Sequence, residues 1–386
     1  MKVLKIIFKN AFRHKLRTLL TIVGIAIAVI AFNMLQTVVT AWYYGLEASS
    51  NNRLITRQAV SFIFPLPYAY KDKIANVEGV ENVTFSTWFQ GVYIDKDQFF
   101  TRVAIEPETF FDVYPEFLLS KEEHETFLKE RNSCVIGRDI AKQYNLKIGD
   151  IMTIDGDIYP GRWDFIVRGI YQPKFESTDA MQMFFHWQYV NERMIVEAPP
   201  RANEVGWYSV KIKDPDKAAV ISNKIDKLFA NSNAETKTET ERAFVQNFIS
   251  ASSAIITSMN VMSFIIVGII MLVLGNTMIM SARERTREYA VLKTLGFSGK
   301  HLIGLILGES FVISAFGAGL GLFLTIPIVE GFAQAIPKSY FPVFKLEDIT
   351  LILSISSAFI VGLLASIFPI QRALTTKIVD GFRHIG

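Results

Sequence analysis

Cysteine is almost absent from the sequence: Cys134 is the only one in 386 residues, so no intrachain disulfide can form. Net charge is also small, because 40 Lys and Arg oppose 37 Asp and Glu, which leaves +3. This balance excludes a strongly basic nucleic-acid binder and an acidic disordered chain. His124 and His186 have no partner at a metal-ligand spacing, and no Ser/His/Asp or Cys/His constellation can be assembled. We therefore expect no metal, no catalytic residue and no nucleic-acid partner.

Charge is missing from four long stretches. Three of them contain no Asp, Glu, Lys or Arg, and the fourth contains only Glu309. The hydrocarbon core of a bilayer is about 30 Å thick and needs about 20 apolar residues in a helix, so each stretch is long enough to cross a membrane. A soluble protein has no reason to segregate charge in this way, and we predict a membrane protein. Its transmembrane helices are expected at 19–46, 255–280, 302–329 and 349–368.

The first stretch has an alternative interpretation as a cleaved signal peptide, because Val39-Thr40-Ala41 is a passable cleavage site. The apolar region of a signal peptide is only about 7–15 residues long, and this run is much longer. We therefore favour a retained membrane anchor.

The short segments that flank the predicted spans differ in Lys and Arg content, which is higher on the cytoplasmic side of membranes. The bias places both termini and the loop 283–301 in the cytoplasm, and residues 47–242 outside. The expected fold class is an α+β membrane protein, with four transmembrane helices and a large α/β extracytoplasmic domain between the first two. The flanking cations are Lys2, Lys5, Lys9, Arg13, Lys15 and Arg17, then Arg283, Arg285, Arg287, Lys293 and Lys300, then Arg372, Lys377 and Arg383.

Residues 47–242 are numerous enough for a periplasmic domain of two subdomains. Alternating apolar residues predict strands at 59–64, 80–94, 151–154, 164–170 and 206–213. Helical patterns lie at 68–75, 121–131, 137–144 and 216–229. Strands interleaved with helices indicate an α+β domain made of βαβ-like units.

Aromatic residues are dense in two parts of this domain, at 88–100 and at 184–189. They could line an apolar groove for a lipid or another amphiphile, or they could fill the core against the sheet. We favour the core.

Residues 1–18 have an amphipathic pattern. Lys and Arg recur at helical spacing, while Leu, Ile and Phe fall on the opposite side. The pattern predicts a cytoplasmic interfacial helix that lies on the anionic leaflet before the first span. The alternative is a charge cluster that only sets the orientation of the chain.

The loop 283–301 begins with charged residues and continues with an apolar stripe, which Gly296 follows. A short amphipathic helix of this kind can dock into a groove on a soluble partner. Its polar rim would be Arg285, Arg287 and Glu288. Its stripe would be Tyr289, Leu292 and Leu295, with Gly296 as the stop signal.

The third span is rich in small residues. Glycines four residues apart permit close packing of helices in lipid, and the pairs here are Gly304 with Gly308 and Gly317 with Gly321. Glu309 is the only ionisable residue inside a span, and because a carboxylate is costly there it should face protein or water. It could act in a proton relay or a conformational switch. A lone carboxylate favours instead a structural hydrogen bond between helices.

Several motifs carry a family resemblance. They are RTLLTIVGI at 17–25, RTREYAVLKTLG at 285–296, Glu309 with the glycine-rich continuation of its span, and PIQRA at 369–373. With the order of one span, a large outer domain and three spans, the chain resembles the MacB/FtsX-type (type VII) ABC transporter permeases without a fused ATPase. Residues 135–150 and 167–171 are similar to the periplasmic core motifs of that family.

The resemblance implies an FtsX-like permease domain at 243–386 and a MacB-like domain before it. It also implies that the loop 283–301 contacts a separate ATPase subunit, present in two copies. A second permease chain would complete the complex, as a homodimer in preference to a heterodimer. A periplasmic adaptor and an outer-membrane partner are further partners that some members of the family use.

The chain has no G-x-x-x-x-G-K-[ST] motif for nucleotide binding. The nearest segment, GFSGKH at 296–301, has the wrong spacing and lacks the hydroxyl residue that would bind Mg²⁺. We expect the chain to be no enzyme and to bind no cofactor, with ATP and Mg²⁺ used by the partner ATPase.

The implied function is mechanotransmission. ATP hydrolysis by the partner would drive periplasmic motion that exports or extracts an amphiphilic substrate, such as a lipid, lipoprotein, peptide or drug. The alternative is a non-transporting, FtsX-like signalling protein that regulates a periplasmic cell-wall hydrolase.

Overall fold

The computed structural model describes residues 2–96, 99–336, 338, 341 and 343–376. The chain forms two compact units, which we call the helical unit and the α/β domain. The helical unit comprises Met1–Ala41, Ser253–Ala335 and Phe344–Gly386, and the α/β domain comprises Trp42–Ser252 and Ile336–Val343. Lys377 and Arg383, which were expected to mark a cytoplasmic C-terminus, lie outside the described residues.

The short segment Ile336–Val343 groups with the α/β domain. Lys338 forms an ion pair with Asp139 of that domain at 2.8 Å, and Phe341 contacts the ring of Trp42. The predicted permease domain 243–386 is therefore interrupted between its last two spans.

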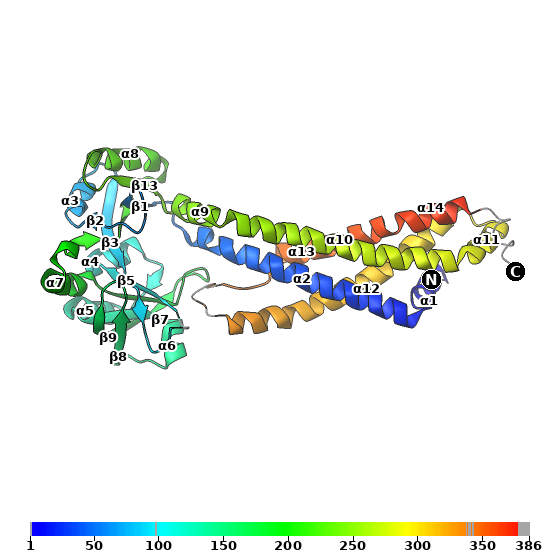
Figure 1. Ribbon diagram of the computed structural model, residues 1–386, viewed down its shortest axis with the longest axis horizontal. Coiled ribbons are helices and arrows are strands. Elements are labelled where there is room, and N and C mark those ends of the chain that lie inside the picture. The colour runs from blue at the N-terminus through cyan, green and yellow to red at the C-terminus, as the bar shows by residue number, and fades with distance from the viewer. Residues whose placement is uncertain (1, 97–98, 337, 339–340, 342, 377–386) are drawn as a thin grey trace. The chain divides into compact units, whose positions relative to one another are not determined.

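The helical unit contains the four predicted membrane helices (Figure 1). By length and composition, the helices able to cross a membrane are Lys15–Tyr44, Ser253–Glu284, Gly299–Ala335 and Asp348–Thr375. The prediction of four spans is confirmed. The helices of the unit are α1 (Lys2–Ala11), α2 (Lys15–Ala48), α10 (Ser253–Glu284), α11 (Thr286–Thr294), α12 (Gly299–Ala335), α13 (Asp348–Ala365) and α14 (Ile367–Thr375).

The fourth span is broken at Ser366, between α13 and α14. Pro369 follows three residues later, and a proline removes a helical N–H and clashes with the carbonyl four residues before it. The Ser366 hydroxyl donates to the Leu363 carbonyl at 2.6 Å. The expected single helix is therefore two helices with a bend.

Glycines of α12 lie where other helices cross it closely. An added Cβ would lie 2.6 Å from the Cβ of Ile25 at Gly317, and 2.8 Å from that of Val29 at Gly321, both on α2. At Gly308 it would lie 2.5 Å from a carbon of Ile7 on α1. At Gly304 no atom of the described residues lies within 4 Å of the added Cβ. Within this chain, α1 crosses α12 one turn further along, at Gly308.

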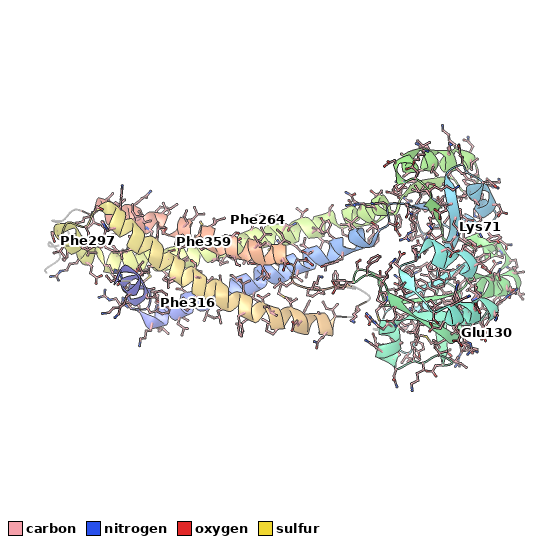
Figure 2. All side chains as sticks on the ribbon, turned by 180° about the vertical axis from the view of Figure 1, so that it is seen from behind. Lys71, Glu130, Phe264, Phe297, Phe316 and Phe359 are labelled. Atoms are coloured by element: carbon pink, nitrogen blue, oxygen red, sulfur yellow. The ribbon has the colours of Figure 1, made fainter. Side chains whose placement is uncertain are left out.

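The amphipathic N-terminus is helical over a shorter range than 1–18. Helix α1 ends at Ala11, a turn follows at Phe12–His14, and Lys15 already begins α2. The apolar side of α1 packs on α12, since Ile7 and Ala11 are buried and the rings of Phe8 and Phe12 meet Phe316 edge-on. Figure 2 labels Phe316, which lies on α12.

The α/β domain is built on a mixed sheet of eleven strands, in the order β13-β1-β12-β3-β5-β10-β7-β9-β8-β4, with β6 beside β9. Strand β10 is parallel to β5 and β7 is parallel to β9, while the other pairs are antiparallel. The strands of this sheet are β1 (Arg53–Gln58), β3 (Val80–Trp88), β4 (Gly91–Val92), β5 (Thr101–Ile105), β6 (Phe117–Leu118), β7 (Ser133–Gly137), β8 (Ile151–Gly156), β9 (Gly161–Pro173), β10 (Gln182–His186), β12 (Trp207–Ile212) and β13 (Thr236–Thr240).

The remaining elements cover this sheet or connect its strands. Strands β2 (Leu66–Pro67) and β11 (Glu204–Val205) form a separate pair. Ser120 and Glu123 form a capping box that starts α5, and Asn145 ends α6 with a left-handed φ of 51°. The helices are α3 (Tyr70–Ala75), α4 (Pro107–Val113), α5 (Lys121–Lys129), α6 (Arg138–Tyr144), α7 (Trp187–Glu197), α8 (Ala218–Leu228) and α9 (Glu241–Ala251), with 3-10 turns at Pro199–Arg201 and Pro215–Lys217.

Side chains pack on both faces of the sheet. Along β10, Phe184 belongs to one hydrophobic cluster and Phe185 to another, as the two-residue period of a strand requires. Most aromatic residues of the dense segments therefore lie in the core, as we favoured over a groove, and Phe89 and Phe100 are buried there too. Trp88 is 37% exposed, and Phe184 also lines a cavity described below.

One predicted strand is wrong. Residues 59–64 form a loop, in which the Gln58 side chain accepts hydrogen bonds from the backbone of Val60 and Ser61. Pro65 ends the segment, and a proline cannot donate to a ladder. The strand lies just before it, at β1, and β1, β5, β7, β10 and β13 were not predicted.

Candidate functional site

A buried ion pair joins the membrane helix α12 to the start of α11. The guanidinium of Arg285 donates to the Glu309 carboxylate at 2.7 Å, and the Ser281 hydroxyl donates to its other oxygen at 3.0 Å. Glu309 is 4% exposed and Arg285 6%. The interhelical hydrogen bond favoured from the sequence is present, and a guanidinium accompanies it.

The same guanidinium also starts a chain of ion pairs that leads outward from the bundle. Arg285 also donates to Glu288 at 2.9 Å, and Glu288 accepts from Arg13. Burial acts against the charge of Arg285, but Tyr289, Glu288 and Glu309 outweigh it and raise the pKa of Arg285. Burial likewise opposes the charge of Glu288, while the bonds from Arg13 and Arg285 lower its pKa overall.

The turn between α1 and α2 binds the end of α10. Arg17 donates to both oxygens of Glu284, at 2.9 and 3.0 Å, and His14 lies 3.2 Å from the same carboxylate. These groups are partly exposed, so each pair contributes little by itself. Together with Arg13 and Glu288 they tie the N-terminal turn to the loop after α10.

Helix α11 is also fixed at its other end. The Lys293 ammonium donates to the backbone carbonyls of Leu374 and Thr376, at 2.9 and 2.7 Å. A cation at the C-terminus of a helix satisfies free carbonyls and the helix dipole there. Gly296 ends the α11 region with φ +85°, the left-handed conformation expected of a stop glycine.

The predicted apolar stripe of α11 does not form one exposed surface. Tyr289 is 2% exposed and belongs to the bundle core, Leu292 packs against that core, and only Leu295 is open, at 69%. Arg285 does not form a polar rim, because it is buried against Glu309. With Arg285 paired to Glu309, Tyr289 lies on the side of α11 that faces the bundle.

The exposed surface of this region is therefore different from the one predicted. Apolar side chains reach solvent at Val291, Leu295 and Phe297, and Arg287 is exposed beside them. Figure 2 labels Phe297 at the end of the helical unit. We call Arg287, Val291, Leu295 and Phe297 the exposed tip.

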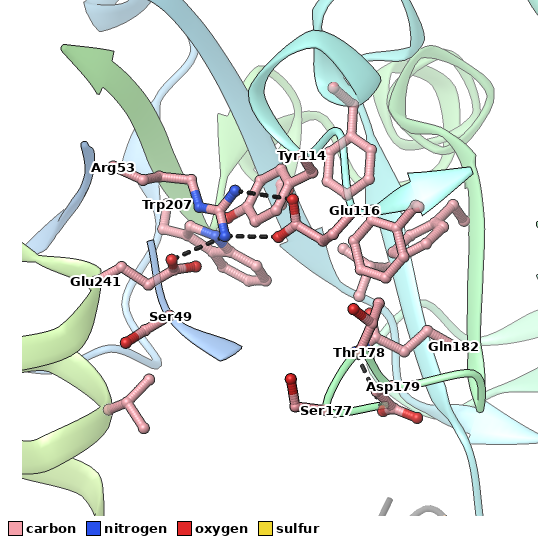
Figure 3. A pocket seen from close by; sticks show the side chains of 16 residues that line it. Ser49, Arg53, Tyr114, Glu116, Ser177, Thr178, Asp179, Gln182, Trp207 and Glu241 are labelled. Atoms are coloured by element: carbon pink, nitrogen blue, oxygen red, sulfur yellow. Dashed lines mark hydrogen bonds and ion pairs between the residues drawn. The ribbon is translucent and has the colours of Figure 1, made fainter. Parts of the chain in front are cut away.

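A second charged cluster lies in the α/β domain, around Arg53 of β1 (Figure 3). Its guanidinium pairs with Glu116 at 2.7 Å and with Glu241 at 2.8 Å, donates to the Val113 carbonyl at 2.8 Å and stacks 3.9 Å from the ring centre of Tyr114. Burial opposes the charge of Arg53, but Tyr114 and the carboxylates raise its pKa.

The Arg53 cluster includes two of the chain segments that continue into membrane helices. Glu241 is the first residue of α9, which leads to α10, and it accepts from the Ser50 backbone, just after α2, at 2.7 Å. One guanidinium therefore connects these two segments with the core of the domain. No sequence pattern indicated this cluster, because its members are far apart; the only signal was a cation in a buried strand.

Two family models match the chain. The MacB-like periplasmic core domain matches residues 18–228, which is more than half of the sequence, and the FtsX-like permease C-terminal model matches residues 260–378. The chain belongs to the MacB/FtsX-type ABC transporter permeases. This permease is a multi-pass membrane protein, and as an ABC permease it works with an ATPase subunit.

Relatives of this permease carry the same description. An uncharacterized ABC transporter permease of Methanocaldococcus jannaschii is 25% identical, over 97% of this chain and 96% of its own length. An uncharacterized ABC transporter permease protein of Mycobacterium tuberculosis is 23% identical over 67% of this chain, which corresponds to 29% of its own length.

Solved structures with some likeness to the permease are periplasmic or extracellular domains. The periplasmic region of MacB from Actinobacillus actinomycetemcomitans has a TM-score of 0.39 at 14% identity, over 53% of this chain and 95% of that one. The extracellular domain of the noncanonic ABC-type transporter YknZ from Gram-positive bacteria has a TM-score of 0.37 at 14% identity, over 49% and 99%. Scores at this level add nothing to the assignment by the family models.

Proposed function

We propose that this permease converts ATP binding and hydrolysis by a separate ATPase into motion of its α/β domain, and that it thereby exports or extracts an amphiphilic substrate. The observation that carries the proposal is the way α11 is held. Glu309 and Lys293 fix its two ends to membrane helices, while the exposed tip remains free for a partner. A helix fixed in this way moves together with the helices that bind it.

Docking of the ATPase at the exposed tip would transmit the free energy of ATP binding and hydrolysis to the permease. An apolar patch beside an arginine suits a groove on a soluble subunit. ATP can shift the permease between two states only if the ATPase binds those states with different free energies. Motion of α10 and α12 would then reach the α/β domain through the chain segments that meet at Arg53.

The remaining parts of the complex belong to the same proposal. Two ATPase subunits use ATP and Mg²⁺, and this chain binds neither. Two copies of the permease form a homodimer in the cell inner membrane, with both termini cytoplasmic and the α/β domain periplasmic. A periplasmic adaptor completes the route if the substrate leaves the envelope.

The test replaces Leu295 by Asp in the reconstituted complex of permease and ATPase. Leu295 is mostly exposed, so its loss should leave the fold intact while a carboxylate opposes docking. ATP hydrolysis should fall to the rate of the ATPase alone. Leu228→Asp is the matched control, because Leu228 is exposed on α8 of the other unit, and it should hydrolyse ATP normally. Normal stimulation by Leu295→Asp would overturn the docking assignment.

A further inference from the structure

A cavity of about 320 Å³ lies in the α/β domain beside the Arg53 cluster (Figure 3). Its size falls in the range of small-molecule sites, which run from about 300 to 1,000 Å³. Residues of β1, α4, β10, β12 and α9 line it, together with the loop before β10. Parts of the chain far apart in sequence thus line one pocket.

Five of the residues that line the cavity are aromatic, and we call them the aromatic wall. Aromatic rings on a cavity wall favour apolar groups and also attract a cation held over their faces. The aromatic lining residues are Phe110, Tyr114, Phe117, Phe184 and Trp207.

The charges around the cavity do not balance. Glu116 and Glu241 share the single guanidinium of Arg53. Asp179 accepts hydrogen bonds from the Met181 backbone at 2.7 Å and from the Gln182 amide at 3.1 Å, and it makes no ion pair with any described residue. The lining therefore carries more carboxylate than cation.

Burial of these carboxylates opposes their ionisation. It raises the pKa of Asp179 to about 6, and it also raises the pKa of Glu241, although Arg53 partly compensates. A cation in the cavity would favour the charged form of both groups.

Two hydroxyls of buried residues line the cavity. They belong to Thr178, which is 7% exposed, and Ser86, which is 1% exposed. A hydroxyl oxygen can accept a hydrogen bond from a ligand as well as donate one. In Figure 3, Thr178 and Asp179 lie across the cavity from Glu241 and Arg53.

We propose that the cavity binds a small amine that carries an apolar group. The ammonium faces Asp179 and the Thr178 hydroxyl, and the apolar group lies on the aromatic wall. An ammonium has three donors and no acceptor, which matches carboxylate and hydroxyl oxygens. A carboxylate ligand would be repelled, and an alcohol would leave the charge uncompensated.

Occupancy of the cavity should influence the segment after α2 and helix α9, through which we propose that motion reaches the α/β domain. Ser49 follows α2, Val245 lies on α9, and both line the cavity. A ligand that contacts these segments and the sheet together can stabilise one arrangement of them over another. The amine is then a substrate class for the proposed transport, and this role, unlike binding itself, rests on the proposed function.

The experiment measures binding to the full chain in lipid nanodiscs by calorimetry at pH 7.5. The probes are 2-phenylethylamine, 2-phenylethanol and 3-phenylpropanoate, which share an aromatic group and differ in charge. The amine should bind with a Kd below about 1 mM and at least about tenfold more tightly than the other two. Tryptophan fluorescence should change with the amine, and Trp207→Phe should remove most of that change.

Asp179→Asn is the deciding variant, because an amide can still accept from the Met181 backbone while the charge is lost. This variant should weaken binding of the amine about tenfold or more and leave the affinity for the alcohol unchanged. Asp164→Asn is the matched control on an exposed side chain and should bind as the unmodified chain does. Equal affinity for the three probes, or unchanged amine affinity in Asp179→Asn, would overturn the proposal.

The cavity and the transport proposal can fail separately. Amine binding that persists in Leu295→Asp supports the cavity even where coupling to the ATPase is lost. Amine binding without any increase in ATP hydrolysis by the intact complex supports the cavity and contradicts the role of the amine as substrate.

Discussion

At the scale of single residues, the pair of Arg285 and Glu309 has the largest energetic consequence. Removing one member of a buried ion pair typically costs about 3–5 kcal/mol, because the other charge remains buried. Arg285 keeps Glu288 as a partner, so we expect Glu309→Gln to lower the free energy of unfolding by about 3 kcal/mol. Unfolding of the purified permease in detergent by denaturant measures this change.

Two controls isolate the contribution of the pair. Glu330→Gln changes an exposed carboxylate on the same helix and should be neutral. The double variant Arg285→Met with Glu309→Met should lose less free energy of unfolding than the two single variants lose in sum. The reason is that it leaves no charge of the pair unpaired. If Glu309→Gln and Glu330→Gln unfold alike, the ion pair does not stabilise the bundle.

Asp179 gives the α/β domain a dependence on pH. Burial raises its pKa to about 6 from an ordinary 3.8, so the folded state holds this proton more tightly than the unfolded state. The stability from this group is fully present below about pH 4 and is lost as pH rises through 6, by about 3 kcal/mol. Asp179→Asn should remove this component from a comparison of unfolding between pH 4 and 7. An unchanged pH profile would contradict the burial of the carboxylate.

At the scale of elements, the sequence predicted the helical unit better than the sheet. A membrane span is a local property, since a charge-free run of sufficient length can only be buried in lipid or protein. The central strands β5, β7 and β10 have five residues each, too few for a clear alternation. Their pairing with distant strands decides their conformation.

The difference between local patterns and contacts of distant residues also explains what the sequence predicted wrongly about α11 and missed at the Arg53 cluster. The pattern of α11 predicted a helix with a stop at Gly296, and both are present. Which side of the helix faces the bundle is decided by Glu309, 24 residues beyond Arg285. The Arg53 cluster joins residues 63 and 188 positions away from Arg53 (116 − 53 and 241 − 53), and no local pattern reports such contacts.

The crossing of α2 and α12 can be tested with one methyl group. Gly317→Ala would place a Cβ 2.6 Å from Ile25, and overpacking of this kind typically costs about 1–3 kcal/mol. Gly304→Ala meets open space and should be neutral or stabilising by up to about 1 kcal/mol, from helix propensity. Thermal unfolding of the two variants should separate them clearly. Equal stability would show that the helices do not cross at Gly317.

At the scale of the whole molecule, the proposed coupling would depend on how the chain enters and leaves the α/β domain. The chain enters the domain through α2 and leaves it through α9. Arg53 binds Glu241 of α9 directly, and Glu241 in turn accepts a hydrogen bond from the segment after α2. Arg53→Lys keeps the charge but loses the planar fork that holds two carboxylates at once. We expect ATP hydrolysis to continue in this variant while the motion of the α/β domain is lost.

The measurement is the distance between spin labels at Lys121 on α5 and Glu330 on α12, with and without a non-hydrolysable ATP analogue. Both sites are exposed, and Cys134 can be retained, because burial raises the pKa of its thiol and leaves it unreactive. The distance should change in the intact complex and stay constant in Arg53→Lys. Arg57→Lys is the control, since Arg57 lies on the same strand and pairs with Glu239 at 3.3 Å, outside the Arg53 cluster. A nucleotide-dependent change that persists in Arg53→Lys would mean that motion reaches the α/β domain without the Arg53 cluster.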